Sequence, residues 1–295
     1  MASAVYFGNK EYFVAIPAPH YGADGSHVGM SSTISLLNGG AIVEDSIAQH
    51  REFSFDWLGD PATLRVVKEF VQGVHGSGPY YWTDPFAADT NLFSPGWATP
   101  RLAQFDWKPI CDSRPSSFVA TPANVYGHPG LSAVYTPGIT SAVRRFTIPI
   151  IPGMSLWFGA SGSVTGTARI NVRVLSSAGL WSSTPFSYTP LSVAAAERYL
   201  VSNDTFSYAS GARFVEVYLY SGAAADTITL TSLVAKLVAT GTSPAHETMF
   251  VAGEGTTGLR FSGGLKETLY TVGGRTTQRR KGFALKLIET EAWEL

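Results

Sequence analysis

The chain has 295 residues, of which 45% are hydrophobic, 13% are aromatic and only 15% are charged, with a net charge of -1. This length is enough for about two domains, and the near-zero net charge excludes a global electrostatic attraction to nucleic acid or to an anionic membrane. A single cysteine, Cys111, excludes an intrachain disulfide and a cysteine cluster for zinc. Low charge together with high aromatic content predicts that part of the surface is covered in an assembly.

Neither a signal peptide nor a membrane span is expected. The opening segment MASAVYFGNKEYF has no basic stretch followed by an apolar one. The longest apolar run, residues 146–160, is interrupted by two prolines and two glycines, so it is too broken to cross a bilayer. We therefore expect a soluble protein that is made in a cytoplasm.

The N-terminal segment predicts short strands. Residues 12–16 form a strand candidate that ends at Pro17. Residues 32–37 and 41–47 flank the dipeptide Asn38-Gly39, which is the strongest short-range signal for a hairpin. Residues 50–57 alternate between apolar and polar side chains, which predicts a half-buried strand.

One amphipathic helix is expected between Asp60, a capping residue, and Gly73, which suits a left-handed C-terminal position. Its apolar residues recur at helical spacing. A long apolar loop follows, here called the aromatic strap. Its aromatic members are Tyr80, Tyr81, Trp82, Phe86, Phe93 and Trp97. Because such a loop must be covered, either by its own domain or by a neighbouring subunit, we assign these six residues as candidates for assembly contacts.

The rest of the chain divides into a second β pattern and a C-terminal completion of the first. Residues 108–138 lose periodicity and are expected to be a linker. From Arg145 onward, alternating segments linked by turns predict an antiparallel sandwich or jelly roll. About fifty residues after Gly241 form strands too few for an independent domain. The predicted fold is therefore mainly β: a β-sandwich with one α-helix, made by residues 1–110 with 241–295, and a jelly roll inserted over residues 111–240.

Motifs for catalysis and cofactors are weak. Residues 253–258 read GEGTTG, which matches G-x-G-x-x-G, but no helix pattern follows, so a glycine-rich turn is expected. The six histidines lack metal-ligand spacing, and no nucleophile-elbow motif G-x-S-x-G occurs. The acidic residues between 111 and 240 are not paired by sequence as a glycosidase requires. We expect no metal, no cofactor and no enzymatic activity.

Two surface features suggest binding. The basic run Arg275, Arg279, Arg280 and Lys281 is interpreted as a solvated loop or an ion-pair partner of an adjacent subunit, with nucleic-acid contact as the weaker alternative. In the jelly roll, strand alternation places a second set of residues outward, where aromatic rings beside planar polar groups are typical of a sugar site. The candidates for saccharide binding are Trp157, Arg169, Asn171, Arg173 and Tyr218. The alternative is that these aromatic residues lie under the opposite sheet or against another chain.

Three sequence runs resemble minor tail proteins of long-tailed bacteriophages, especially of actinobacteria. They are the opening YFGNKEYFVAIPAPH, the run GPYYWTDPFAADTNLFSPGWATPRLA, and the closing GEGTTGLRFSGG and KGFALKLIETEAW. The layout also looks like that of distal tail proteins, in which a β-sandwich with one helix builds a ring at the tail tip and carries a second β domain. Many such proteins append the second domain, whereas an insertion is expected here.

The resemblance implies a structural component of the virion tail tip that is synthesised in the host bacterial cytoplasm. It implies a ring homo-oligomer, expected to be a hexamer, with the tail tube, tail hub and tape measure proteins as neighbours. It also implies contact with a host cell-wall saccharide through the lectin-like domain. A cell-wall glycan hydrolase of the tail tip is the alternative function.

Overall fold

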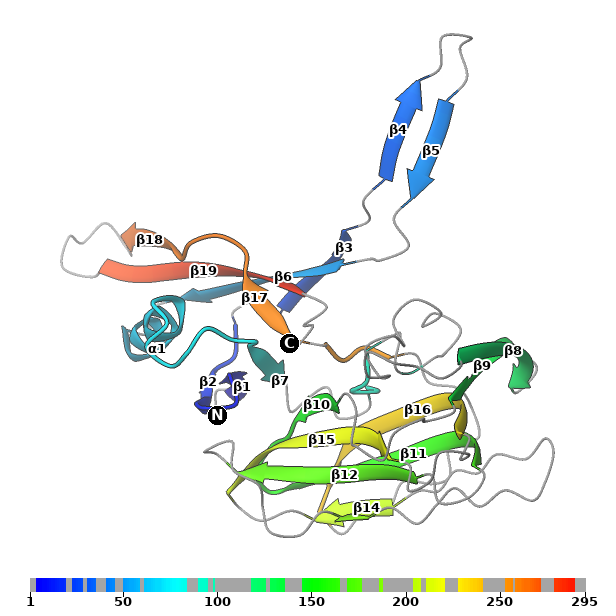
Figure 1. Ribbon diagram of the computed structural model, residues 1–295. Helices are drawn as coiled ribbons and strands as arrows, with labels where there is room; N and C mark the ends of the chain where they lie inside the picture. Colours follow the sequence, from blue (N-terminus) through cyan, green and yellow to red (C-terminus); the bar gives the residue numbers. More distant parts are fainter. Residues whose placement is uncertain are drawn as a thin grey trace. The chain divides into compact units, whose positions relative to one another are not determined.

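The computed structural model describes the chain in segments. The described residues are 4–19, 23–28, 31–35, 41–45, 50–58, 61–83, 90–94, 98, 118–125, 128–135, 145–164, 169–176, 186–187, 204–207, 211–220, 228–240, 253–256, 258–271 and 279–289. Strands dominate these segments, as the sequence predicts, and Figure 1 gives their labels.

The bounds of the elements are as follows. The helix α1 spans Pro61–Val71. The strands before the insertion are β1 (Ala4–Gly8), β2 (Phe13–Pro17), β3 (Ala23–Val28), β4 (Ser31–Ser35), β5 (Ala41–Asp45), β6 (His50–Leu58) and β7 (Tyr81–Thr83). The middle strands are β8 (Phe118–Val125), β9 (His128–Tyr135), β10 (Arg145–Pro149), β11 (Met154–Val164), β12 (Arg169–Ser176), β13 (Phe186–Ser187), β14 (Asp204–Ser207), β15 (Ala212–Tyr220) and β16 (Ile228–Ala239). The last strands are β17 (Leu259–Phe261), β18 (Lys266–Thr271) and β19 (Arg279–Glu289).

The chain divides into two compact units. The first consists of Met1–Asn9, Val14–Tyr81 and Gly258–Leu295, and the second of Lys10–Phe13 and Trp82–Thr257. The first unit is therefore made from both ends of the chain, and the second is interposed between residues 81 and 258. The predicted limits of 110 and 240 lie inside the second unit.

The first unit is closed across the point where the chain leaves and returns. Tyr80 and Leu259 form an antiparallel bridge, in which each backbone N–H donates to the other residue's carbonyl at 2.8 Å. Two positions that are far apart in sequence are thus hydrogen-bonded neighbours. An interposed domain requires such neighbouring chain ends.

The main sheet of the first unit has the order β17-β19-β6-β3, with β18 also paired to β19. The strand β6 shows why alternation predicted it: Phe55 and Trp57 are buried, while Asp56 between them is exposed. The strands β17 and β18 both pair with β19. A smaller sheet has the order β2-β1-β7.

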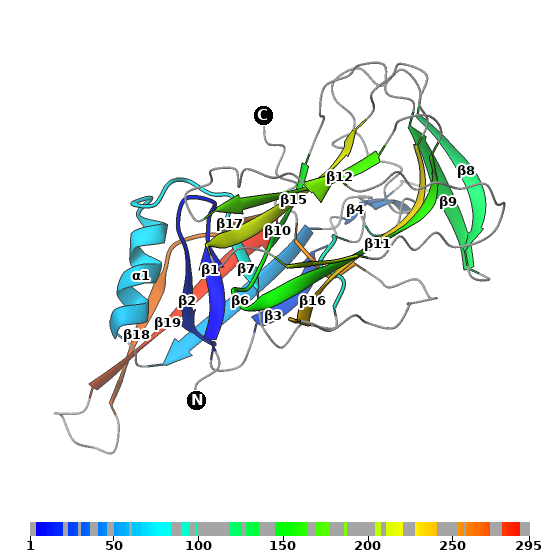
Figure 2. The ribbon, with the colours of Figure 1, turned by 90° about the horizontal axis from the view of Figure 1, so that it is seen from below.

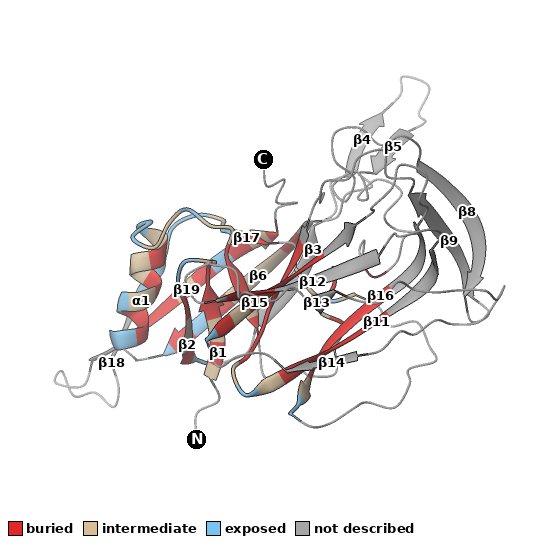
Figure 3. Cartoon of the chain, turned by 60° about the horizontal axis from the view of Figure 1, so that its bottom comes forward, coloured by how far each residue is buried: buried red, intermediate tan, exposed pale blue. Residues whose placement is uncertain are grey.

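The helix α1 buries one face, formed by Leu64, Val67 and Phe70, as its apolar spacing predicts (Figure 3). Phe70 meets Phe7 of β1 edge-to-face, with ring centroids 5.2 Å apart. Figure 2 shows α1 beside the β1–β2 pair. Gly73 takes a φ of 74°, the left-handed conformation that ends the helix without a Cβ penalty. The apolar stripe and the terminal glycine together explain why this segment is the chain's clearest helix signal.

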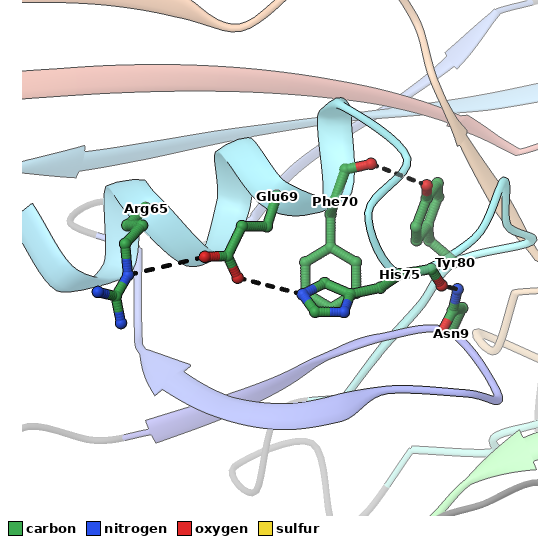
Figure 4. A network of polar contacts seen from close by, with 6 residues as sticks. All are labelled: Asn9, Arg65, Glu69, Phe70, His75 and Tyr80. Carbon is green, nitrogen blue, oxygen red and sulfur yellow. Dashed lines mark hydrogen bonds and ion pairs between the residues drawn. The ribbon is translucent and has the colours of Figure 1, made fainter.

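A polar network fixes the turn after α1 (Figure 4). His75 Nε2 lies 3.1 Å from a carboxylate oxygen of Glu69, and the Asn9 side-chain amide donates to the His75 carbonyl. The Tyr80 hydroxyl lies within hydrogen-bond reach of the Phe70 and Gly76 carbonyls, at 3.1 and 3.0 Å. Burial raises the pKa of the Tyr80 hydroxyl, and the Arg260 charge opposes that rise. The network anchors the start of the aromatic strap to the helix.

A buried ion pair joins the two halves of the first unit. Arg51 Nε and Nη2 donate to the two carboxylate oxygens of Glu289 at 2.7 and 2.8 Å. Both side chains are about one-tenth exposed, and a two-point geometry of this kind is the strongest that an arginine and a carboxylate form. Removing one partner would leave a buried charge, so the pair holds β6 and β19 in one register.

In its described residues, the second unit is an eight-stranded jelly roll with one added strand. Its strands form four nested antiparallel pairs, which are β9–β16, β10–β15, β11–β14 and β12–β13. These pairs divide between two sheets, of order β10-β15-β12-β13 and β14-β11-β16-β9-β8. Nested pairs rolled into two sheets are the jelly-roll arrangement, so the predicted fold class is confirmed.

The expected linker over residues 108–138 is wrong. It contains β8 and β9, which pair with each other over eight positions. The prolines and glycines of this hairpin obscured its alternation: Pro122 faces Leu131 and Gly130 faces Ala123 in the register.

We expect the fragment 82–257 to unfold at a higher temperature than the fragment 111–240, because only the longer one contains Asn91 and Phe93. Asn91 binds β16, and Phe93 fills the sandwich core. Thermal unfolding followed by circular dichroism tests this. Equal melting temperatures would show that residues 82–110 do not stabilise the jelly roll.

Candidate functional site

Four of the five predicted saccharide residues lie on neighbouring positions of the four-stranded sheet. Asn171 of β12 lies between Tyr218 of β15 and Ser187 of β13, and Tyr218 in turn faces Arg145 of β10. These four positions form one row across the sheet, spaced about 4.8 Å from strand to strand. A row with a cationic, an aromatic, an amide and a hydroxyl residue has the residue types that bind sugars.

Two more candidates flank this row. Arg169 faces Tyr220 and Arg173 faces Glu216, and both arginines are two residues from Asn171 along β12. Alternate residues of a strand share a face, so Arg169, Asn171, Arg173 and Tyr218 occupy one face of the sheet. This face is the candidate saccharide surface.

One end of the candidate saccharide surface is covered within the second unit. Lys10 Nζ lies 3.2 Å from a carboxylate oxygen of Glu216, and the Phe13 ring lies 4.8 Å from that of Phe214. Glu216, two residues from Tyr218 along β15 and therefore on the same face, is only 5% exposed. The segment Lys10–Phe13 is about 200 residues away in sequence, so strand alternation alone could not reveal this cover.

Trp157 does not belong to the candidate surface, and its predicted outward position is wrong. It lies on β11, in the other sheet of the jelly roll, and is 2% exposed. Its neighbours Leu156 and Phe158 are also buried, so this part of β11 is covered on both faces. A ring without an open face has no surface on which a sugar can stack.

The described part of the aromatic strap is mainly core, so the predicted role of its residues in assembly contacts is wrong for those that are buried. Tyr80 packs against Phe7 and Phe261 in the first unit, and Tyr81 is also buried. In the second unit, Phe93 contacts Phe146 and Phe158 across the jelly-roll core. Trp82 is half-buried. The candidates Phe86 and Trp97 lie outside the described residues.

Asn91 explains why the strap is bound so closely to the second unit. The side-chain nitrogen of Asn91 donates to the Leu233 backbone carbonyl at 2.9 Å, and the side-chain oxygen of Asn91 accepts from the Ala235 N–H at 3.0 Å. Leu92 N–H then donates to the Ala235 carbonyl at 2.8 Å. Since β9 pairs with β16 only at residues 228–230, the strap satisfies backbone groups of β16 beyond that point. Asn91 was not identified from the sequence, where one polar residue in an aromatic loop carries no signal.

The motif GEGTTG packs against the same strap. The backbone N–H groups of Glu254 and Gly255 both donate to the backbone carbonyl of Asn91. The Gly255 N–H also donates to the backbone carbonyl of Phe93 at 2.9 Å. A Cβ on Gly255 would fall 1.6 Å from the Leu92 carbonyl oxygen, and one on Gly253 would fall 2.5 Å from that of Ser94. The glycines therefore permit a close backbone approach. The strand β17 follows this segment, not the helix that a dinucleotide loop needs.

The substitution Gly255→Ala should destabilise the protein strongly, because backbone atoms of the strap would have to move. We expect a loss of about 1–3 kcal/mol in unfolding free energy, which is the range for overpacked positions. Gly264→Ala is the matched control, since a Cβ there meets nothing within 4 Å. Urea unfolding of the two variants measures the difference. If they are equally stable, the close approach at Gly255 is not a constraint.

The described residues were also compared with the requirements of a metal site and of a membrane-spanning helix. Within the described segments, no group of three or more histidine, cysteine, aspartate or glutamate residues could hold a metal ion. Among the described residues, no helix is long and apolar enough to cross a membrane.

Comparisons with known proteins give little similarity. No protein-family model matches the chain, and no curated protein matches it. One matching solved structure is the enzymatically active domain of tailspike protein 4 from bacteriophage CBA120. The alignment has 18% sequence identity and a TM-score of 0.31, and it covers 41% of this chain and 18% of that chain. The chain thus spans less than a fifth of the tailspike structure that it matches.

Proposed function

We propose that this chain is a structural protein of a bacteriophage tail tip, a distal tail or baseplate ring component, whose first unit forms a homo-hexameric ring. In this proposal the jelly roll is an accessory domain that contacts a host cell-wall saccharide, and no bond is broken. The tail tube, tail hub and tape measure proteins are its expected neighbours in the virion.

The observation that carries the proposal is the interposition of a jelly roll within a mainly β unit that has a single helix in its described residues. This layout agrees with what the resemblance to distal tail proteins implies, namely a β-sandwich with one helix that carries a second β domain. Since a fold does not define a function, the support comes from the layout and the sequence resemblance together.

The candidate saccharide surface suits weak, repeated binding. A shallow sugar site commonly reaches only about millimolar affinity, which corresponds to roughly -4 kcal/mol. Several copies on one ring raise the effective affinity by roughly a hundredfold or more. Weak sites that are presented together are sufficient for adsorption, and they also permit release and re-binding across a cell surface.

If the proposed ring forms, electron micrographs should show closed assemblies. Purified protein, alone and mixed with the tail tube and tail hub proteins, should give ring-shaped particles with six subunits in negative stain. A cyclic ring needs two different complementary surfaces on each subunit. If only monomers appear in both preparations, the proposed tail-ring role is wrong.

Saccharide binding predicts a contrast between two kinds of variant. Asn171→Ala with Tyr218→Ala should reduce binding of the assembled protein to host cell walls by about tenfold or more, with little change in melting temperature. Trp157→Ala should instead lower the unfolding free energy by about 3–5 kcal/mol, because it empties a buried site. Pull-down with purified walls and thermal unfolding measure the two effects.

Three outcomes would change this proposal. Normal wall binding by the Asn171 and Tyr218 variant would move the site elsewhere, and absence of binding by the unmodified protein would reduce the jelly roll to a spacer. Release of soluble saccharide from the walls would favour the alternative, a cell-wall glycan hydrolase of the tail tip.

A further inference from the structure

The first unit carries a long β-hairpin arm. Its base is the antiparallel pair β3–β6, which ends where Val28 faces His50. The pair β4–β5 continues beyond that point, from Ser31 facing Asp45 to Ser35 facing Ala41 (Figure 1). In the described residues β4 and β5 form a sheet of two strands. Such a ribbon is marginally stable in isolation, so this part of the arm gains from a partner.

The arm is acidic. The sequence from Ala23 to Gln49 contains three acidic residues, Asp24, Glu44 and Asp45, and neither lysine nor arginine. Two of these acids end β5, at the register positions that face Ser31 and Ser32. Charges on an edge strand deter pairing with uncharged edges and favour a basic partner.

A second hairpin, β18–β19, is basic. The sequence from Lys266 to Lys281 contains five cationic residues and a single acidic one, Glu267. The cationic residues are Lys266, Arg275, Arg279, Arg280 and Lys281. Glu267 already forms an ion pair with Lys68 of α1 at 2.5 Å. Three of the cations end the hairpin, where Arg279, Arg280 and Lys281 face Thr271, Tyr270 and Leu269.

The acidic arm and the basic hairpin lie at opposite ends of one strand. The arm continues from the His50 end of β6, whereas the β18–β19 hairpin continues from the other end, where Leu58 faces Gly282. The nine residues of β6 separate these ends by about 26 Å. That is about three Debye lengths at physiological ionic strength. Within one subunit the two charged hairpins therefore do not neutralise each other.

We infer that the acidic β4–β5 arm of one subunit docks on the basic β18–β19 hairpin of the next copy of this chain. The inference rests on the proposed ring and names the surfaces that close it. Opposite charges at the two ends of one rigid strand pair are two different, complementary patches, which is what head-to-tail association requires. The occupant is a second copy because this chain itself supplies both charged partners.

Charge reversal tests the docking on the full chain. The variant with Glu44→Lys and Asp45→Lys, and the variant with Arg279→Glu and Arg280→Glu, should each weaken self-association by about tenfold or more in sedimentation velocity. Combining all four substitutions in one chain should restore most of the association, since opposite charges then face each other again. Association of the unmodified protein should also weaken as NaCl rises from 50 to 500 mM.

Matched controls separate docking from net charge. Asp56→Lys and Lys286→Glu change exposed residues on β6 and β19, outside both hairpin ends, and should leave association unchanged. Equal melting temperatures show that each variant is folded. If rings form in both reversal variants, the arm inference is wrong while the proposed ring stands. Monomers of the unmodified protein under all conditions overturn both. Loss of binding to a duplex DNA probe in the Arg279 and Arg280 variant, without loss of association, would assign the basic hairpin to nucleic acid instead.

Discussion

The pairing of β6 with β19 is the constraint on which the first unit depends. It joins residues from the two ends of the chain over seven register positions, from Gly282 facing Leu58 to Ile288 facing Glu52. The buried Arg51–Glu289 pair fixes that register at one end, and the stacked rings of Trp57 and Phe283, 4.9 Å apart, fill the sheet's inner face. The second unit lies between these two strands in the sequence, so the chain must leave the first unit after β6 and return to it before β19.

Local features of the fold were predictable because their signals are local. The helix has a cap, an apolar stripe and a terminal glycine within a few residues, and the β4–β5 hairpin surrounds an Asn-Gly dipeptide. The jelly roll was predictable as a class, since its apolar strands recur with turns between them. The hairpin β8–β9 was missed because its prolines and glycines break the alternation on which strand prediction depends.

The candidate site was predictable only in part, since alternation shows which residues share a face but not what covers that face. It placed Arg169, Asn171, Arg173 and Tyr218 on one face of their sheet, and the register puts these four positions on adjacent strands. It failed for Trp157, because β11 is buried on both faces. The covers come from distant segments, such as Lys10–Phe13 over Glu216 and Asn91 along β16. The signal for such covers is absent from any short window of sequence.

The Tyr80–Leu259 bridge lies next to the points where the chain passes between the first unit, which is proposed for ring assembly, and the second unit, which is proposed for host binding. Its two backbone hydrogen bonds of 2.8 Å close the first unit where the insertion begins and ends. Substitutions on the candidate saccharide surface lie in the second unit, so they leave this bridge and the β6–β19 pairing intact. Both charged hairpins belong to the first unit, so the surfaces proposed for assembly are independent of the surface proposed for host binding. In the proposed function, this arrangement lets substitutions alter the candidate saccharide surface without altering the surfaces proposed for assembly.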